Sequence, residues 1–148
     1  MLFRSLLEEK FIKNSNNNFT ILKDNLYFRN ITFQNLQILK MISFLVRDKN
    51  WNNYDPKILN YEENFDSSLE YIFDLEYGIT EILKTRNTIL FSENSITLSS
   101  EGSFLTDFWT NRIGFNLLIP LQNHVGSNII VTKEAGVKEE KKIGRAHV

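Results

Sequence analysis

The most regular feature of the sequence is the alternation of large apolar and polar side chains with a period of two residues. Between Leu69 and Tyr77 every odd position is large and apolar, whereas Glu70, Asp74 and Glu76 occupy even positions. On a pleated strand this alternation buries one face and leaves the other in water. We therefore predict a strand over Leu69–Tyr77 that places Leu69, Tyr71, Phe73 and Leu75 in the core.

Similar runs recur along the chain, separated by short polar segments such as Lys23–Asn25 and Ser92–Asn94. Asn and Asp tolerate the left-handed backbone that tight turns require, so these segments are typical of hairpins. Many short strands at this spacing indicate an all-β protein, and we predict an antiparallel β-sandwich with little helix. The further predicted strands are Phe19–Lys23, Leu26–Phe33, Ile38–Arg47, Thr85–Ser92, Ser95–Ser103, Arg112–Ile119 and Asn128–Thr132.

Other segments fit the alternation less well. Asp48–Pro56 is polar and predicts a loop leaving a strand, with Trp51 and Tyr54 as anchoring aromatics. Residues 3–12 fit either a short helix or a first strand, and Lys133–Lys142 is highly charged and expected to fray. In the predicted strand Arg112–Ile119, Ile113 and Phe115 are expected in the core. The glycine between them indicates a bulge or a close backbone approach.

Length and composition restrict the class of protein. The 148 residues are 42% hydrophobic, which indicates a globular domain, and they contain no cysteine, which excludes disulfides. The 17 basic and 18 acidic residues give no basic surface for nucleic acid or an anionic membrane. Leu2–Leu7 is too short for a secretory signal and Ile38–Val46 too short to span a bilayer. We expect a cytoplasmic protein.

The last six residues differ in composition from the rest of the chain. Ile143–Val148 reads as a common sequencing adapter translated in one frame, and Lys142 matches the adapter's preceding bases. Alanine occurs only at positions 135 and 146. We therefore expect residues 1–142 to form an N-terminal β-sandwich domain that is truncated at its C-terminus, and residues 143–148 to be an artefact of sequencing.

Recognisable catalytic motifs are missing from the sequence. It contains no nucleophile elbow, HExxH pair, phosphate-binding loop or Gly-rich dinucleotide motif. His124 is the only histidine before residue 143 and is expected in a surface loop. The carboxylates Glu62–Glu63 and Glu139–Glu140 are most simply solvated charges. We assign no catalytic residue, no metal ligand and no cofactor.

Two arginines lie where an apolar run meets a loop. Arg47 ends the run before Asp48–Trp51, and Arg112 follows Thr110 and Asn111. One interpretation is structural, with an arginine capping a sheet edge or pairing with Asp48 or Asp107. The other is that Arg47 or Arg112 contacts a sugar-acid ligand or the next domain. Both remain open, and the candidate contact residues are Arg47, Asp48, Trp51, Asn111 and Arg112.

The blocks Gln37–Trp51 and Phe104–Pro120 resemble the N-terminal region of the D-apionate lactonases. The resemblance implies that full-length relatives hydrolyse the lactone of D-apionate to the open acid. It also implies that this β domain precedes a larger barrel-like catalytic domain, so the expected partners are that missing C-terminal domain and a small sugar-acid lactone. The alternative is a carbohydrate-binding or packing sandwich of another sugar-active enzyme, such as a glycoside hydrolase.

Overall fold

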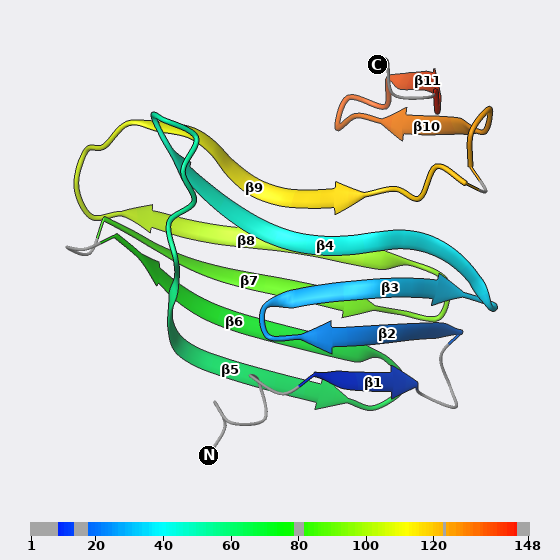
Figure 1. Cartoon of the computed structure of the whole chain (residues 1–148), viewed down its shortest axis with the longest axis horizontal. Coiled ribbons are helices and arrows are strands. Elements are labelled where there is room, and N and C mark those ends of the chain that lie inside the picture. Colours follow the sequence, from blue (N-terminus) through cyan, green and yellow to red (C-terminus); the bar gives the residue numbers. More distant parts are fainter. Residues whose placement is uncertain (1–8, 14–17, 79–81, 123, 145–148) are drawn as a thin grey trace. The chain divides into compact units, whose positions relative to one another are not determined.

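The computed structural model describes residues 9–13, 18–78, 82–122 and 124–144 (Figure 1). The chain divides into two compact units, residues 1–118 and residues 119–148. Within the described residues, regular structure consists of β-strands, without a helix. No stretch of these residues forms a helix that could cross a membrane.

The first unit contains two antiparallel sheets (Figure 1). The five-stranded sheet has the order β1-β2-β3-β4-β9 and the four-stranded sheet the order β5-β6-β7-β8. Short turns join several of the neighbouring strands, and at two of these turns Asn25 and Asn35 adopt positive φ angles of 54° and 66°. The strands are β1 (Lys10–Lys13), β2 (Phe19–Asp24), β3 (Tyr27–Phe33), β4 (Leu36–Asp48), β5 (Lys57–Phe65), β6 (Leu69–Tyr77), β7 (Leu83–Phe91), β8 (Ile96–Phe104) and β9 (Thr110–Leu118).

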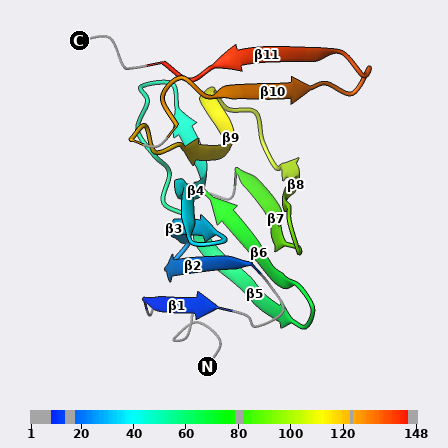
Figure 2. The ribbon, with the colours of Figure 1, turned by 90° about the vertical axis from the view of Figure 1, so that its right-hand side faces the viewer.

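Aromatic side chains fill the space between the two sheets, which face one another in Figure 2. Phe28 of β3 is fully buried, and its ring centroid lies 4.8 Å from that of Tyr71 and 5.9 Å from that of Phe73, both on β6. Phe19 of β2 makes an edge contact with Phe91 of β7 at 5.6 Å. Such edge-to-face pairs add to the stabilisation from apolar burial. The predicted β-sandwich is confirmed.

The predicted register of β6 is also confirmed. Leu69, Tyr71, Phe73 and Leu75 are all buried, whereas Glu70 and Asp74 lie on the opposite, partly exposed face. Glu76, expected on that face as well, is buried at the end of the strand. A shift of one residue would exchange these two sets of side chains, so the hydrophobic pattern fixes the register. Seven other predicted strands match β2, β3, β4, β7, β8, β9 and, in the second unit, β10 (Asn128–Thr132) to within a few residues.

Two strands of the sandwich were not predicted clearly. β5 was missed because Glu62 and Glu63 interrupt its alternation. In the structure, Tyr61 donates a hydrogen bond to Glu63 and Arg86 lies 4.0 Å from Glu62, so the carboxylates are paired within the sheet. The ambiguous residues 3–12 begin outside the described part of the chain, and Lys10–Lys13 forms the strand β1.

Strand β9 contradicts one part of the core prediction. Ile113 is 36% exposed, and Phe115 is only partly buried against Phe44. The reason is position: β9 is the edge strand of its sheet and pairs only with β4, so its inward face lacks complete cover. The bulge or close backbone approach expected at Gly114 is also not observed. The register runs unbroken through the Leu45–Gly114 pair, and nothing lies within 4 Å of a Cβ built on the glycine, which adopts a φ of 152°.

The second unit contains a hairpin of β10 (Asn128–Thr132) and β11 (Lys138–Lys142). The expectation that Lys133–Lys142 frays is therefore wrong, because five residue pairs join the two strands and Glu139 lies between two lysines. Ile143 continues the pairing, since its N–H donates to the Ser127 carbonyl and its carbonyl accepts from Gly126, both at 2.8 Å. Residues 145–148 lie outside the described part.

Candidate functional site

A β-bulge shapes the end of the β4–β9 ladder. Arg47 pairs with Arg112 and Asp48 pairs with Thr110, so Asn111 is an extra residue on β9. The Thr110 hydroxyl donates to the Arg47 carbonyl at 2.7 Å, and the Asn111 side-chain amide donates to the Lys49 carbonyl at 2.6 Å. These side-chain hydrogen bonds fasten the start of β9 to the turn after β4. Bulges commonly redirect side chains beside functional sites.

The turn after β4 is held by Asp48. One of its carboxylate oxygens accepts hydrogen bonds from the backbone N–H groups of Asn50, at 2.8 Å, and Asn52, at 2.9 Å. Trp51 lies between these two residues with a φ of 67°. A left-handed backbone at a bulky residue costs on the order of 1–3 kcal/mol and persists only where surrounding contacts enforce it. Asp48 supplies such contacts, and the result is an indole held outside the core.

Arg112 and Trp51 are in contact. The guanidinium carbon of Arg112 lies 5.9 Å from the centroid of the Trp51 ring, within the range of a cation–π interaction. Of the two aromatics expected to anchor this loop, Tyr54 packs partly buried against the core, whereas Trp51 remains 55% exposed and does not anchor it. The exposed indole ring instead forms a flat apolar surface beside the guanidinium group of Arg112.

Arg47 faces Arg112 directly across the ladder. Because Val46 is buried in the core, the neighbouring Arg47 points to the outer face of the five-stranded sheet. Its Nε is buried without a hydrogen-bond partner. Among the described residues neither arginine forms an ion pair, so the interpretation in which Asp48 or Asp107 neutralises one of them is not observed. Like charges directly opposite on a sheet destabilise it.

The five residues singled out in the sequence thus gather at one end of the five-stranded sheet, and they divide into two groups. Asp48 and Asn111 hold the backbone of the turn and the bulge. The second group consists of Arg47, Arg112 and Trp51. It provides two positive charges and an exposed aromatic ring, and its side chains do not hold the backbone of the turn or the bulge. The chemistry available here is recognition of an anion.

An aromatic groove borders the same turn and was missed in the sequence. A cavity of about 240 Å³ is lined by Asp48, Lys49, Asn50, Tyr54, Phe108 and Trp109. Trp109 is 82% exposed, whereas Phe108 is partly buried and makes edge contact with Tyr54 at 6.3 Å. In the sequence, Phe108 and Trp109 stand side by side just before Arg112. Because two adjacent aromatics break the period-two alternation, the pattern does not predict which of them is buried and which is exposed.

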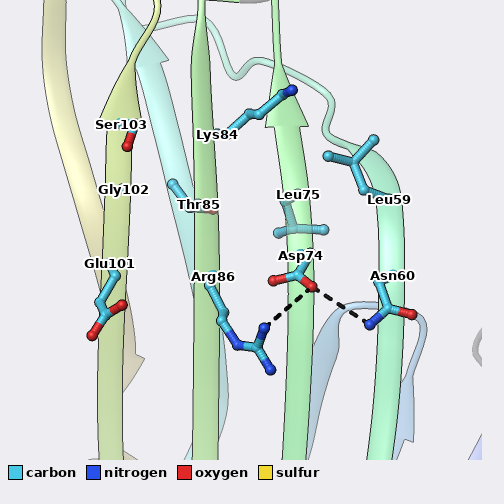
Figure 3. Close-up of a pocket in the computed structure, with 10 residues that line it drawn as sticks. All are labelled: Leu59, Asn60, Asp74, Leu75, Lys84, Thr85, Arg86, Glu101, Gly102 and Ser103. Atoms are coloured by element: carbon cyan, nitrogen blue, oxygen red, sulfur yellow. Dashed lines mark hydrogen bonds and ion pairs between the residues drawn. The ribbon is translucent and has the colours of Figure 1, made fainter.

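The outer face of the four-stranded sheet carries a shallow depression of about 570 Å³ (Figure 3). Figure 3 shows Asp74 between Arg86 and Asn60; the Asp74 carboxylate lies 3.8 Å from the guanidinium and accepts the amide hydrogen bond at 3.5 Å. These groups neutralise one another and are partly exposed. Their arrangement is that of a solvated face, as the alternation in β6 and β7 predicts.

The interior contains polar groups that the sequence did not reveal. Lys23 is 1% exposed, and its Nζ lies 5.0 Å from the centroid of the Tyr61 ring. Burial lowers the pKa of Lys23 to about 8. Asn87 is also buried and accepts a hydrogen bond from Ser100 at 2.6 Å. These positions obey the alternation of inward and outward residues, but the pattern alone predicts apolar side chains there.

Titratable residues elsewhere form no cluster within the described residues that could hold a metal ion. His124 lies in a turn of the second unit, as predicted, with its backbone N–H donating to the Leu121 carbonyl at 3.1 Å.

Two comparisons with known proteins, one with family models and one with individual proteins, indicate the same family. Residues 8–146 match the family described as D-apionate lactonase, N-terminal domain. A D-apionate lactonase of Brucella anthropi is 28% identical over 120 residues, which cover 78% of this chain and 20% of that protein. The chain thus spans about a fifth of the curated relative that it matches. No solved structure matches it. The chain belongs to the family of D-apionate lactonase N-terminal domains.

Proposed function

We propose that this β-sandwich is the non-catalytic N-terminal domain of a sugar-acid lactone hydrolase that converts D-apionolactone to D-apionate. In this proposal the chemistry is carried by a larger domain that follows the sandwich in the full-length protein. Arg47, Asp48, Trp51, Asn111 and Arg112 form a surface that contacts a ligand or that domain.

The observation that carries the proposal is the family match over residues 8–146, whose description is that of an N-terminal domain. The matched lactonase is about five times as long as the aligned stretch, which leaves ample chain for a separate catalytic domain. The residues of the sandwich support the same view. Asp48 caps a turn, Asp74 pairs with Arg86, and Glu63 accepts from Tyr61, so these carboxylates have structural roles.

The alternative, a carbohydrate-binding or packing sandwich of a glycoside hydrolase, has no support from the comparisons. A glycoside hydrolase requires two carboxyl groups across a cleft at a fixed separation. The carboxylates of the four-stranded sheet instead pair with Arg86 on an open face.

The test is lactone hydrolysis by the full-length protein. The product of the full-length gene should be assayed on D-apionolactone and, as a comparison, on an unsubstituted five-membered lactone. We expect acid release from D-apionolactone well above the uncatalysed rate and slower release from the simpler lactone. A well-folded full-length protein that leaves D-apionolactone intact would contradict the proposed substrate.

A further inference from the structure

Arg47 and Arg112 are directly opposite on neighbouring strands, on the outer face of the five-stranded sheet, and neither forms an ion pair within the described part of the chain. We propose that Arg47, Arg112 and Trp51 form a binding site for a small polyhydroxy carboxylate, the open form of a sugar acid. The site is separate from the chemistry of lactone opening. The inference rests on the proposed function only for the identity of the preferred acid.

The case for an anion comes from the two arginines. Arg47 and Arg112 occupy directly opposite positions on neighbouring antiparallel strands, where side chains approach closely. Each guanidinium presents a planar fork of donors that matches a carboxylate. A carboxylate placed between them would relieve their repulsion and could satisfy the buried Nε of Arg47.

The case for a sugar acid, as against a simple carboxylate, comes from Trp51. Its exposed ring lies beside Arg112, so a ligand whose carboxylate reaches the arginines would place its carbon chain along the indole. Small-molecule sites combine an aromatic surface with a few fixed polar groups. The hydrogen bonds of Asp48 hold the turn that carries Trp51, so the surface is preformed.

The charge of the ligand determines the selectivity of the site. A lactone is a neutral ring, whereas the hydrolysed acid carries a carboxylate at neutral pH. The arginine pair should therefore bind D-apionate and reject D-apionolactone. In a lactone hydrolase, such a site would respond to the product.

The chain allows a clean optical test because it contains two tryptophans. In a Trp109→Phe variant, Trp51 is the lone tryptophan and reports directly on the site. We expect titration with D-apionate to give a saturable change in Trp51 fluorescence at millimolar concentrations or lower, weakened by added salt. D-apionolactone, freshly dissolved, should give no saturable change. D-gluconate serves as a second sugar acid.

Substitutions assign the effect to the arginines. Arg47→Gln and Arg112→Gln in the same background should each weaken D-apionate binding at least about tenfold, since each removes a charged donor. Arg47→Lys, which keeps the charge but loses the fork, should lie between Arg47→Gln and the parent. The matched control is Arg29→Gln, which removes an arginine that pairs with Asp24 at 3.4 Å; it should change binding by less than about twofold.

Titration calorimetry with the same ligands measures binding, and the melting temperature of each variant measures its stability. If the arginines serve a ligand, their replacement by glutamine should leave the melting temperature unchanged or raise it, because repulsion is removed. The inference is overturned if D-apionate and D-gluconate both fail to bind, if the lactone binds equally well, or if the glutamine variants bind as the parent does. Binding of D-gluconate alone would uphold the site and count against D-apionate as its ligand. An inactive full-length enzyme would contradict the proposed function and leave the binding result standing.

Discussion

Replacement of the buried Lys23 by methionine should stabilise the sandwich at neutral pH. Lys23 lies on β2 with its ammonium group between the sheets, against the ring of Tyr61. Burial lowers the pKa of Lys23 from 10.5 to about 8, with Glu63 partly offsetting the effect. Methionine has a similar shape and no charge to desolvate, so it removes the unfavourable term and retains most of the packing.

The magnitude follows from the change in pKa. At about 1.4 kcal/mol per pKa unit, the lowering of the Lys23 pKa from 10.5 to about 8 corresponds to roughly 3 kcal/mol of destabilisation of the charged form on folding. Loss of the cation–π contact with Tyr61 offsets on the order of 0.5–1 kcal/mol of this. We therefore expect Lys23→Met to raise the free energy of unfolding at pH 7 by roughly 1–3 kcal/mol.

The pH dependence gives the sharper test. Between pH 8 and pH 10.5 the unfolded chain keeps the Lys23 proton that the folded chain has lost, so the parent gains stability as the pH rises. The advantage of Lys23→Met should therefore shrink by pH 10. Burial raises the pKa of Tyr61, Tyr71 and Tyr77, which lowers the stability of both proteins above about pH 10, so the comparison is made below that pH.

The measurement is urea unfolding followed by circular dichroism at several values between pH 7 and pH 10. Lys40→Met is the matched control, because Lys40 is exposed on β4 of the same sheet. The control should change stability by less than about 0.5 kcal/mol at every pH. Parallel stability curves for Lys23→Met and the parent would refute the reasoning, since they would mean that the ammonium group is not desolvated.

Three further substitutions test other parts of the structure by denaturant unfolding. Phe28→Ala should lower stability by about 3–5 kcal/mol, because it empties the centre of the aromatic core, and a loss under about 1 kcal/mol would argue against that packing. Asp48→Ala should cost about 1–2 kcal/mol through two lost hydrogen bonds to the turn, while the exposed Asp55→Ala should be nearly neutral. Deleting residues 144–148 should change stability by less than about 0.5 kcal/mol, whereas removing Ile143 as well should cost about 1 kcal/mol; equal effects would contradict the role of its backbone hydrogen bonds.

The sequence predicts the sandwich well where one face of a strand is fully buried. In β6 the alternation of Leu69, Tyr71 and Phe73 with Glu70 and Asp74 follows directly from burial on one side. The prediction of buried positions from alternation fails where a strand has a neighbour on only one side. Ile113 has the same local pattern, but its exposure depends on β9 lying at the edge of the sheet, and edge position is a property of topology that local periodicity does not contain.

The sequence singles out the five candidate residues, but it does not predict their geometry. Arginines at the junction of strand and loop marked Arg47 and Arg112 in the sequence. Their direct apposition, however, depends on the register of two strands more than sixty residues apart. The left-handed backbone of Trp51 depends on the hydrogen bonds that Asp48 makes within its turn, and the exposure of Trp109 depends on a loop; the alternation of apolar and polar residues describes neither.

The most direct test of the account compares this chain with the full-length protein in the same lactonase assay. Equal molar amounts of the 148-residue chain and the completed protein are given D-apionolactone, and acid release is followed by titration at constant pH. Catalysis requires groups positioned around a cleft, and the account places them outside the sandwich. We predict acid release at the uncatalysed rate for the chain and turnover for the completed protein. Sustained turnover by the purified chain, well above the uncatalysed rate, would contradict the account.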